Sequence, residues 1–191
     1  MKDNKMKLLT YLPVCIVINI VGAFLAVQFK LPIYLDTIGT FMASFLFGPL
    51  YGEVAGGLTS LVNGISFDPP SLYFMPVQII VGFSAGALYK HGMFKGVKIV
   101  PATIIVTVLG SVVSSAIAAF VFNGVTSSGS AYIVAVLKNM GVDVFKAVFS
   151  TQIFTDIIDK AVAVFLVTVV LKALPESLKP QKRIKISAIQ E

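Results

Sequence analysis

Long apolar runs separated by short polar breaks dominate this chain. The clearest of these runs occupy residues 8–28, 72–89, 99–122 and 151–174. A helix needs about 20 apolar residues to cross the hydrocarbon core of a bilayer, and most of these runs reach that length. The first three of them contain no charged side chain. The pattern therefore predicts an all-α, polytopic membrane protein.

The region between the first two of these runs is harder to divide. It is apolar from Asp36 to Ser66 apart from Glu53, but Gly48-Pro49 interrupts it. Proline lacks an amide donor and disfavours a helical conformation in the preceding residue. The region is therefore one kinked span or two short helices.

The basic residues decide between these alternatives. They gather in three clusters, Lys2/Lys5/Lys7, Lys90/Lys95/Lys98 and Lys172/Lys179/Lys182/Arg183/Lys185. Two short helices give six spans and place all three clusters on one side of the membrane, whereas one kinked span would place the later two outside. Because cytoplasmic loops are enriched in Lys and Arg, we predict six transmembrane helices with both termini cytoplasmic.

The chain is then expected to form a single integral membrane domain, residues 1–191. The predicted spans are 8–28, 36–50, 53–65, 72–89, 99–122 and 151–174. The long outer loop 123–150 is expected to contain a short surface helix over 131–140.

Composition supports this class and excludes others. Only 13% of the residues are charged, against about 25% in soluble domains. The net charge of +6 comes from residues that flank apolar runs, so no nucleic-acid surface is predicted. The single cysteine, Cys15, allows neither a disulfide within the chain nor a cysteine metal cluster. Residues 8–28 lack a clear cleavage site and are predicted to be a retained helix.

Catalytic chemistry finds no support in the sequence. There is no phosphate-binding glycine motif, and the one histidine, His91, lies among lysines in a predicted cytoplasmic loop. We therefore predict no catalytic residue, no metal site and no enzymatic activity.

Small residues recur at every fourth position across the inner turn and the third span. A helix face of this kind lets another helix approach closely, either within one bundle or from a partner subunit. The sequence leaves both possibilities open. The candidate packing or partner face consists of Gly22, Ala26, Gly48, Gly52, Gly56 and Ser60.

Ionisable residues enter the last apolar run at Asp156, Asp159 and Lys160. The first and the last are four residues apart, which suits an ion pair on one helix face. Charges at membrane depth are costly and therefore indicate function. A simple cap on the outermost turn is the alternative.

Other polar side chains gather toward the same outer side of the predicted bundle. Polar groups among aromatic walls are typical of a small-molecule pocket. The candidate substrate-binding residues are Asp36, Asn63, Tyr73, Gln78, Asn123, Gln152, Asp156 and Lys160.

Three segments carry a family resemblance. They are "LDTIGTFMASF" at 35–45, "LFGPLYGEVAG" at 46–56 and "DIIDKAVAVFLVTVVLKALP" at 156–175. A GPxxGxxxG turn between two short helices, in a six-span chain of about this size, resembles the S components of energy-coupling factor (ECF) transporters. The resemblance covers nearly the whole chain.

The resemblance implies a specific function. S components are the substrate-capturing subunits of bacterial vitamin importers, located in the cell membrane. They bind a micronutrient in an outward-facing pocket and associate with a T subunit and two ATPases. The chain itself would bind no cofactor, and ATP would be used by the partner ATPases. The small-residue faces would contact the T subunit, although the AxxxA motif frequent in the first helix of the family has only Gly22–Ala26 as its nearest equivalent here.

The sequence does not identify the substrate, and it leaves a rival function open. The rival is a self-sufficient, oligomeric secondary transporter or channel for a small solute. A purely structural membrane scaffold is a third possibility.

Overall fold

The computed structural model describes residues 2–174, and for residues 2–7 it describes the backbone alone. The basic cluster near the C-terminus lies outside this range except for Lys172. All regular structure in the described chain is helical, which confirms the all-α prediction. The elements are α1 (Lys2–Gln28), α2 (Ile38–Phe47), α3 (Pro49–Ser66), η1 (Pro69–Leu72), α4 (Met75–Lys90), η2 (Gly96–Lys98), α5 (Ile99–Phe120), α6 (Ser130–Asn139) and α7 (Val144–Ala173).

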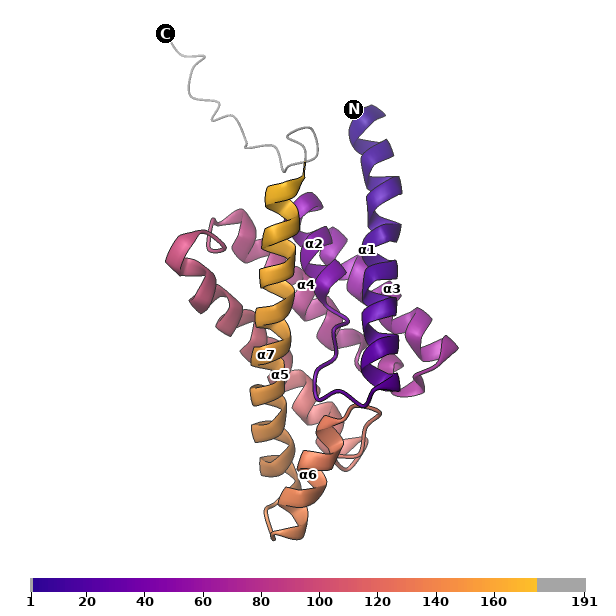
Figure 1. Ribbon diagram of the computed structural model, residues 1–191, viewed down its shortest axis with the longest axis vertical. Coiled ribbons are helices and arrows are strands. Elements are labelled where there is room, and N and C mark those ends of the chain that lie inside the picture. Colours follow the sequence, from indigo (N-terminus) through magenta and orange to yellow (C-terminus); the bar gives the residue numbers. More distant parts are fainter. Residues whose placement is uncertain (1, 175–191) are drawn as a thin grey trace.

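The helices form one bundle with two distinguishable ends (Figure 1). The start of α1, the connection from α4 to α5 and the end of α7 lie toward the top in this view. Helix α6 lies at the opposite end, called here the α6 end. Helix α3 packs against α4 and α2, and α7 packs against α5 and α6.

A single residue, Gly48, separates α2 from α3. Gly48 has a φ of 101°, a conformation that side chains disfavour, and Pro49 is the first residue of α3. Two helices therefore occupy the ambiguous region, and the second begins at Pro49 rather than at Glu53.

Helix α7 begins at Val144, well before the predicted start at Thr151. The carboxylate of Asp143 accepts hydrogen bonds from the backbone N–H groups of Phe145 (3.0 Å) and Lys146 (3.2 Å). An acceptor at this position satisfies amides that have no partner in the first helical turn, so it fixes the start of the helix.

Glycines allow α3 and α4 to pack backbone against backbone. A Cβ on Gly82 would lie 2.4 Å from the carbonyl carbon of Gly52, and one on Gly86 would lie 2.5 Å from Cα of Pro49. A Cβ on Gly56 would lie 2.9 Å from the carbonyl oxygen of Gln78. The small-residue stripe of α3 therefore provides the close approach of α4.

The other residues of the candidate packing face also have places inside the fold. A Cβ on Gly22 would lie 2.1 Å from the carbonyl oxygen of Leu35, and Ala26 and Ser60 are buried. Contact of this face with a partner subunit stays a prediction.

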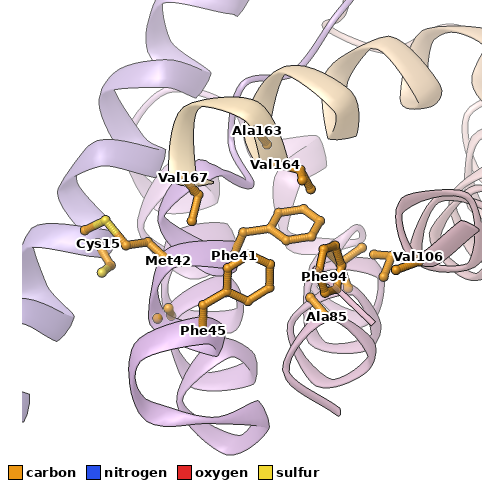
Figure 2. Close-up of a cluster of buried hydrophobic side chains, with 14 of the residues drawn as sticks. Cys15, Phe41, Met42, Phe45, Ala85, Phe94, Val106, Ala163, Val164 and Val167 are labelled. Carbon is orange, nitrogen blue, oxygen red and sulfur yellow. The ribbon is translucent and has the colours of Figure 1, made fainter. Parts of the chain in front are cut away.

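The main apolar core lies between α1, α2, α4, α5 and α7 (Figure 2). Phe41 and Phe45 of α2 are almost fully buried and meet Phe94, which follows α4. Val164 and Val167 cover the cluster from α7. This packing fixes α7 against α2, and so positions the polar residues that lie one to two turns earlier on α7.

Much apolar surface faces outward. Phe83 is 54% exposed and Phe165 is 66% exposed. By length and composition, Leu8–Gln28 and Gly96–Phe120 could each cross a membrane.

Candidate functional site

The segment that joins α1 to α2 crosses the face of α7. We call residues 29–37 the strap. The carboxylate of Asp159 accepts hydrogen bonds from the backbone N–H groups of Tyr34 (3.1 Å) and Leu35 (2.7 Å) and from the hydroxyl of Thr37 (3.4 Å). Asp159 is fully buried. It therefore does not cap an exposed turn but ties the strap to the interior of the bundle.

A buried cluster of charges lies directly beside this attachment. Nζ of Lys160 lies 3.0 Å from Oδ1 of Asp156 and 3.2 Å from Oδ2 of Asp159. The hydroxyl of Ser111, from α5, donates to the other oxygen of Asp156 at 2.7 Å. All of these side chains are buried. Such a cluster is tolerated away from water only because each charge has charged and hydrogen-bonding partners.

The charge cluster forms one wall of a cavity. Its empty volume is about 510 Å³, a figure that includes space open to solvent. The strap, η1, α4, α5, α7 and the loop after α5 all contribute to it. Its lining residues are Tyr34, Asp36, Thr37, Asp68, Ser71, Phe74, Val77, Gln78, Ser114, Thr126, Ser127, Gln152, Asp156 and Lys160. A second hollow of about 310 Å³ lies against α1 and shares Tyr34 and Asp36 with the first.

Five of the eight predicted substrate-binding residues line this one cavity. They are Asp36, Gln78, Gln152, Asp156 and Lys160. They come from the strap, α4 and α7, so the fold brings together residues up to 124 positions apart in the chain (36 to 160).

The other three predicted residues do not line the cavity. Asn63 is buried on α3, and Tyr73 is 57% exposed, with its ring packed edge-on against Phe122. Asn123 is exposed in the turn after α5, where its carbonyl oxygen accepts a hydrogen bond from Nζ of Lys138 (3.1 Å).

Several residues that line the cavity were not among the substrate-binding residues predicted from the sequence. Tyr34 lies in the irregular strap, and its hydroxyl donates to Oε1 of Gln152 at 3.3 Å. Ser114 lies on α5 beside Ser111 and Ser115, and small residues so spaced are typical of close helix packing rather than of a pocket. Asp68 lies in the turn between α3 and η1, and it lines the cavity as well.

A chain of hydrogen bonds orients Gln78 in the cavity wall. Oδ1 of Asn19 accepts from the backbone N–H of Gly39 (2.6 Å), so its amide nitrogen must face Thr40, whose hydroxyl it reaches at 2.9 Å. That hydroxyl donates in turn to Oε1 of Gln78 (3.3 Å), and Nε2 of Gln78 donates to the backbone carbonyl oxygen of Asp36 (3.4 Å). Because a backbone N–H can only donate, the N–H of Gly39 fixes which group donates and which accepts in this whole series of hydrogen bonds.

The cavity offers polar and apolar groups with which a small molecule can be bound. Among residues 2–174, no group of three or more His, Cys, Asp or Glu side chains is placed to hold a metal ion. The cavity offers carboxylate and hydroxyl acceptors, amide donors and the apolar walls of Phe74 and Val77.

Comparison with known families gives a match over residues 7–171 to the family described as "ECF transporter, substrate-specific component". Neither a curated protein nor a solved structure shows significant similarity to the chain. The members of this family are membrane transporter subunits and not enzymes. Since the match spans most of the chain, this protein belongs to the family of substrate-specific components of ECF transporters.

Proposed function

We propose that this chain is an S component that captures a small, vitamin-like micronutrient in the cavity between the strap, α4, α5 and α7. The observation that carries the proposal is that five of the predicted polar residues line one cavity. Buried ionisable groups at a cavity wall are costly to fold, and ligand recognition is a function that explains why they are there.

The cavity would open to the outside of the cell. On this topology α1, α2, α3, α4, α5 and α7 cross the bacterial cell membrane, and both termini are cytoplasmic. Lys90, Lys95 and Lys98 lie in and beside the α4–α5 connection, at the end of the bundle where α1 begins and α7 ends (Figure 1). The excess of lysine in cytoplasmic loops assigns that end to the cytoplasm.

Helix α6 would then lie at the outer membrane surface, near the mouth of the cavity. The loop that precedes it is held to the strap, because the backbone N–H of Gly129 donates to the carbonyl oxygen of Leu31 (3.0 Å). Ser127, from the same loop, lines the cavity.

Transport would be driven by partner proteins. Membership of the family implies a T subunit and two ATPases, which would hydrolyse ATP while this chain binds the solute. The chain itself would bind no nucleotide.

Co-purification tests the assembly. The tagged full-length chain is co-expressed with an ECF T subunit and two ATPases and purified in mild detergent. We expect a stoichiometric complex of four proteins. A chain that purifies alone, or only with copies of itself, would favour a self-sufficient transporter.

Ligand capture is tested in the same preparation. Small molecules released by denaturing the protein are identified by mass spectrometry, and binding of the released compound is measured by calorimetry. Gln78→Ala should weaken binding by about tenfold or more, since it removes an amide of the cavity wall. Tyr73→Ala is the matched control, because Tyr73 lies outside the cavity, and it should bind as the wild type does.

A further inference from the structure

The charges of the cavity are not balanced. Its lining holds three carboxylates, from Asp36, Asp68 and Asp156, but only one ammonium group, from Lys160. A fourth carboxylate, that of Asp159, lies directly behind the wall and contacts the same ammonium group. Lys30 lies near the mouth, where Nζ donates to the carbonyl oxygen of Ser127 (3.4 Å), but this contact is exposed and solvent screens it.

The single ammonium group is already engaged by protein carboxylates. Lys160 lies between Asp156 and Asp159, and both contacts are of ion-pair length. An anionic ligand would have to compete with two buried carboxylates for this one cation. It would also have to approach two further acids of the lining. A carboxylate or phosphate group is therefore poorly matched to the cavity.

Among the described residues, Asp36 and Asp68 have no cation within ion-pair distance, although the ammonium group of Lys160 also attracts Asp36 at longer range. Both are shielded from bulk water, since Asp68 is 9% exposed and Asp36 is only partly exposed. A charge in such surroundings attracts an opposite charge more strongly than one at an open surface. The cavity is thus electrostatically complementary to a cation.

We propose that the ligand of this cavity is a small organic cation, an ammonium or protonated amidine-type group, whose N–H donors bind at Asp36 and whose apolar part packs on Phe74 and Val77. This inference rests on the proposed binding function and adds the chemical class of the ligand. Phe74 would contribute further, because an aromatic face attracts a cation. The buried charge cluster of Lys160, Asp156 and Asp159 would form a fixed part of the cavity wall and would not bind the charged group of the ligand.

Three probes of nearly equal shape test the charge directly. Benzamidinium is cationic, benzamide is neutral and benzoate is anionic, and each consists of one aromatic ring with one small polar group. Burial raises the pKa of Asp36 to about 7, so binding of the probes to the purified full-length chain is measured by calorimetry at about pH 8, where this carboxyl group is largely charged. In parallel, small molecules released from the protein on denaturation are identified by mass spectrometry.

We expect the released compound to carry a basic nitrogen, and benzamidinium to bind at least about tenfold tighter than the other two probes. Asp36→Asn keeps the shape of the side chain and should lower the preference for the cation by about tenfold. Asp143→Asn is the matched control. It removes one negative charge outside the cavity and leaves an acceptor at the start of α7, so the preference should be unchanged.

Two outcomes would overturn the proposal, and they differ in what they leave standing. Release of an acid, or binding of benzoate as tight as that of benzamidinium, would exclude the cation class while leaving the cavity as a ligand site. If no compound is released, no probe binds and Gln78→Ala changes nothing, both the cation class and the proposed binding function fail.

Discussion

Replacing Lys160 by methionine tests whether the buried charges hold the bundle together. The substitution keeps an unbranched side chain of similar length but removes the ammonium group. Asp156 and Asp159 would then lie close to each other, buried and without a cation. They would also lose hydrogen bonds of 3.0 and 3.2 Å to Nζ.

The expected loss is large because both remaining carboxylates are almost fully buried. Removal of one partner from a buried ion pair costs about 3–5 kcal/mol. For a chain of this size, about 2–4 °C of melting temperature corresponds to each kcal/mol, so Lys160→Met should unfold roughly 6–20 °C below the wild type. Other hydrogen bonds to both carboxylates persist, from Ser111 to Asp156 and from the strap to Asp159.

Thermal unfolding in detergent, followed by circular dichroism, measures this effect. A second substitution, Asp156→Asn, removes one of the two uncompensated charges, so it should recover part of the stability lost in Lys160→Met. In the wild-type background the same change should destabilise, because it weakens the pair. The resulting double-mutant cycle should give a coupling of about 1 kcal/mol or more. Unchanged unfolding of Lys160→Met, or a cycle without coupling, would refute the electrostatic account.

Two pairs of substitutions, each a test with its control, probe the packing of α3 against α4 and the hydrogen bond from Ser111 to Asp156 by the same unfolding measurement. Gly82→Ala should destabilise by more than about 2 kcal/mol, because its Cβ would lie 2.4 Å from backbone of α3; Gly57→Ala, whose nearest neighbour would be 3.8 Å away, should be neutral or should gain up to about 1 kcal/mol of helix propensity. Equal effects of the two would contradict the close approach of α3 and α4. Ser111→Ala should cost about 1.5–3 kcal/mol, because it leaves an oxygen of a buried carboxylate without its donor. Ser115→Ala should be nearly neutral, because that buried hydroxyl has no hydrogen-bond partner in the described structure, and a loss equal to that of Ser111→Ala would show that general packing is responsible.

The sequence by itself determined the helical class and most of the helices. Apolar runs of about membrane thickness leave few alternatives to helix, since every backbone polar group must be satisfied within the segment. The break between α2 and α3 at Gly48 could also be predicted from the local sequence, because a glycine followed by a proline changes the direction of the chain wherever it occurs. Helix starts were less predictable. The start of α7 depends on the side chain of Asp143, which accepts from two backbone N–H groups, and the apolar pattern alone does not mark this position.

The choice of residues that line the cavity depended on tertiary structure more than the helices did. Sequence placed Gln78, Gln152 and Asp156 on one side of the predicted membrane, and the fold brings them into one cavity. It could not separate them from Tyr73 and Asn123, which share that side of the membrane but lie outside the cavity. The depth of a side chain in the membrane follows from its residue number, whereas the part of the bundle that the side chain faces depends on which helices are neighbours.

The strap shows this limit most clearly. Residues 29–37 have no periodicity, and nothing local indicates that Tyr34 and Leu35 donate their backbone N–H groups to a carboxylate of α7. That contact exists because α7 packs against α2 through Val164 and Val167, which brings Asp159 to the strap. The sequence thus determined which charges enter the bundle. Only the packing of distant helices decided which groups neutralise them, and which carboxylates line the cavity.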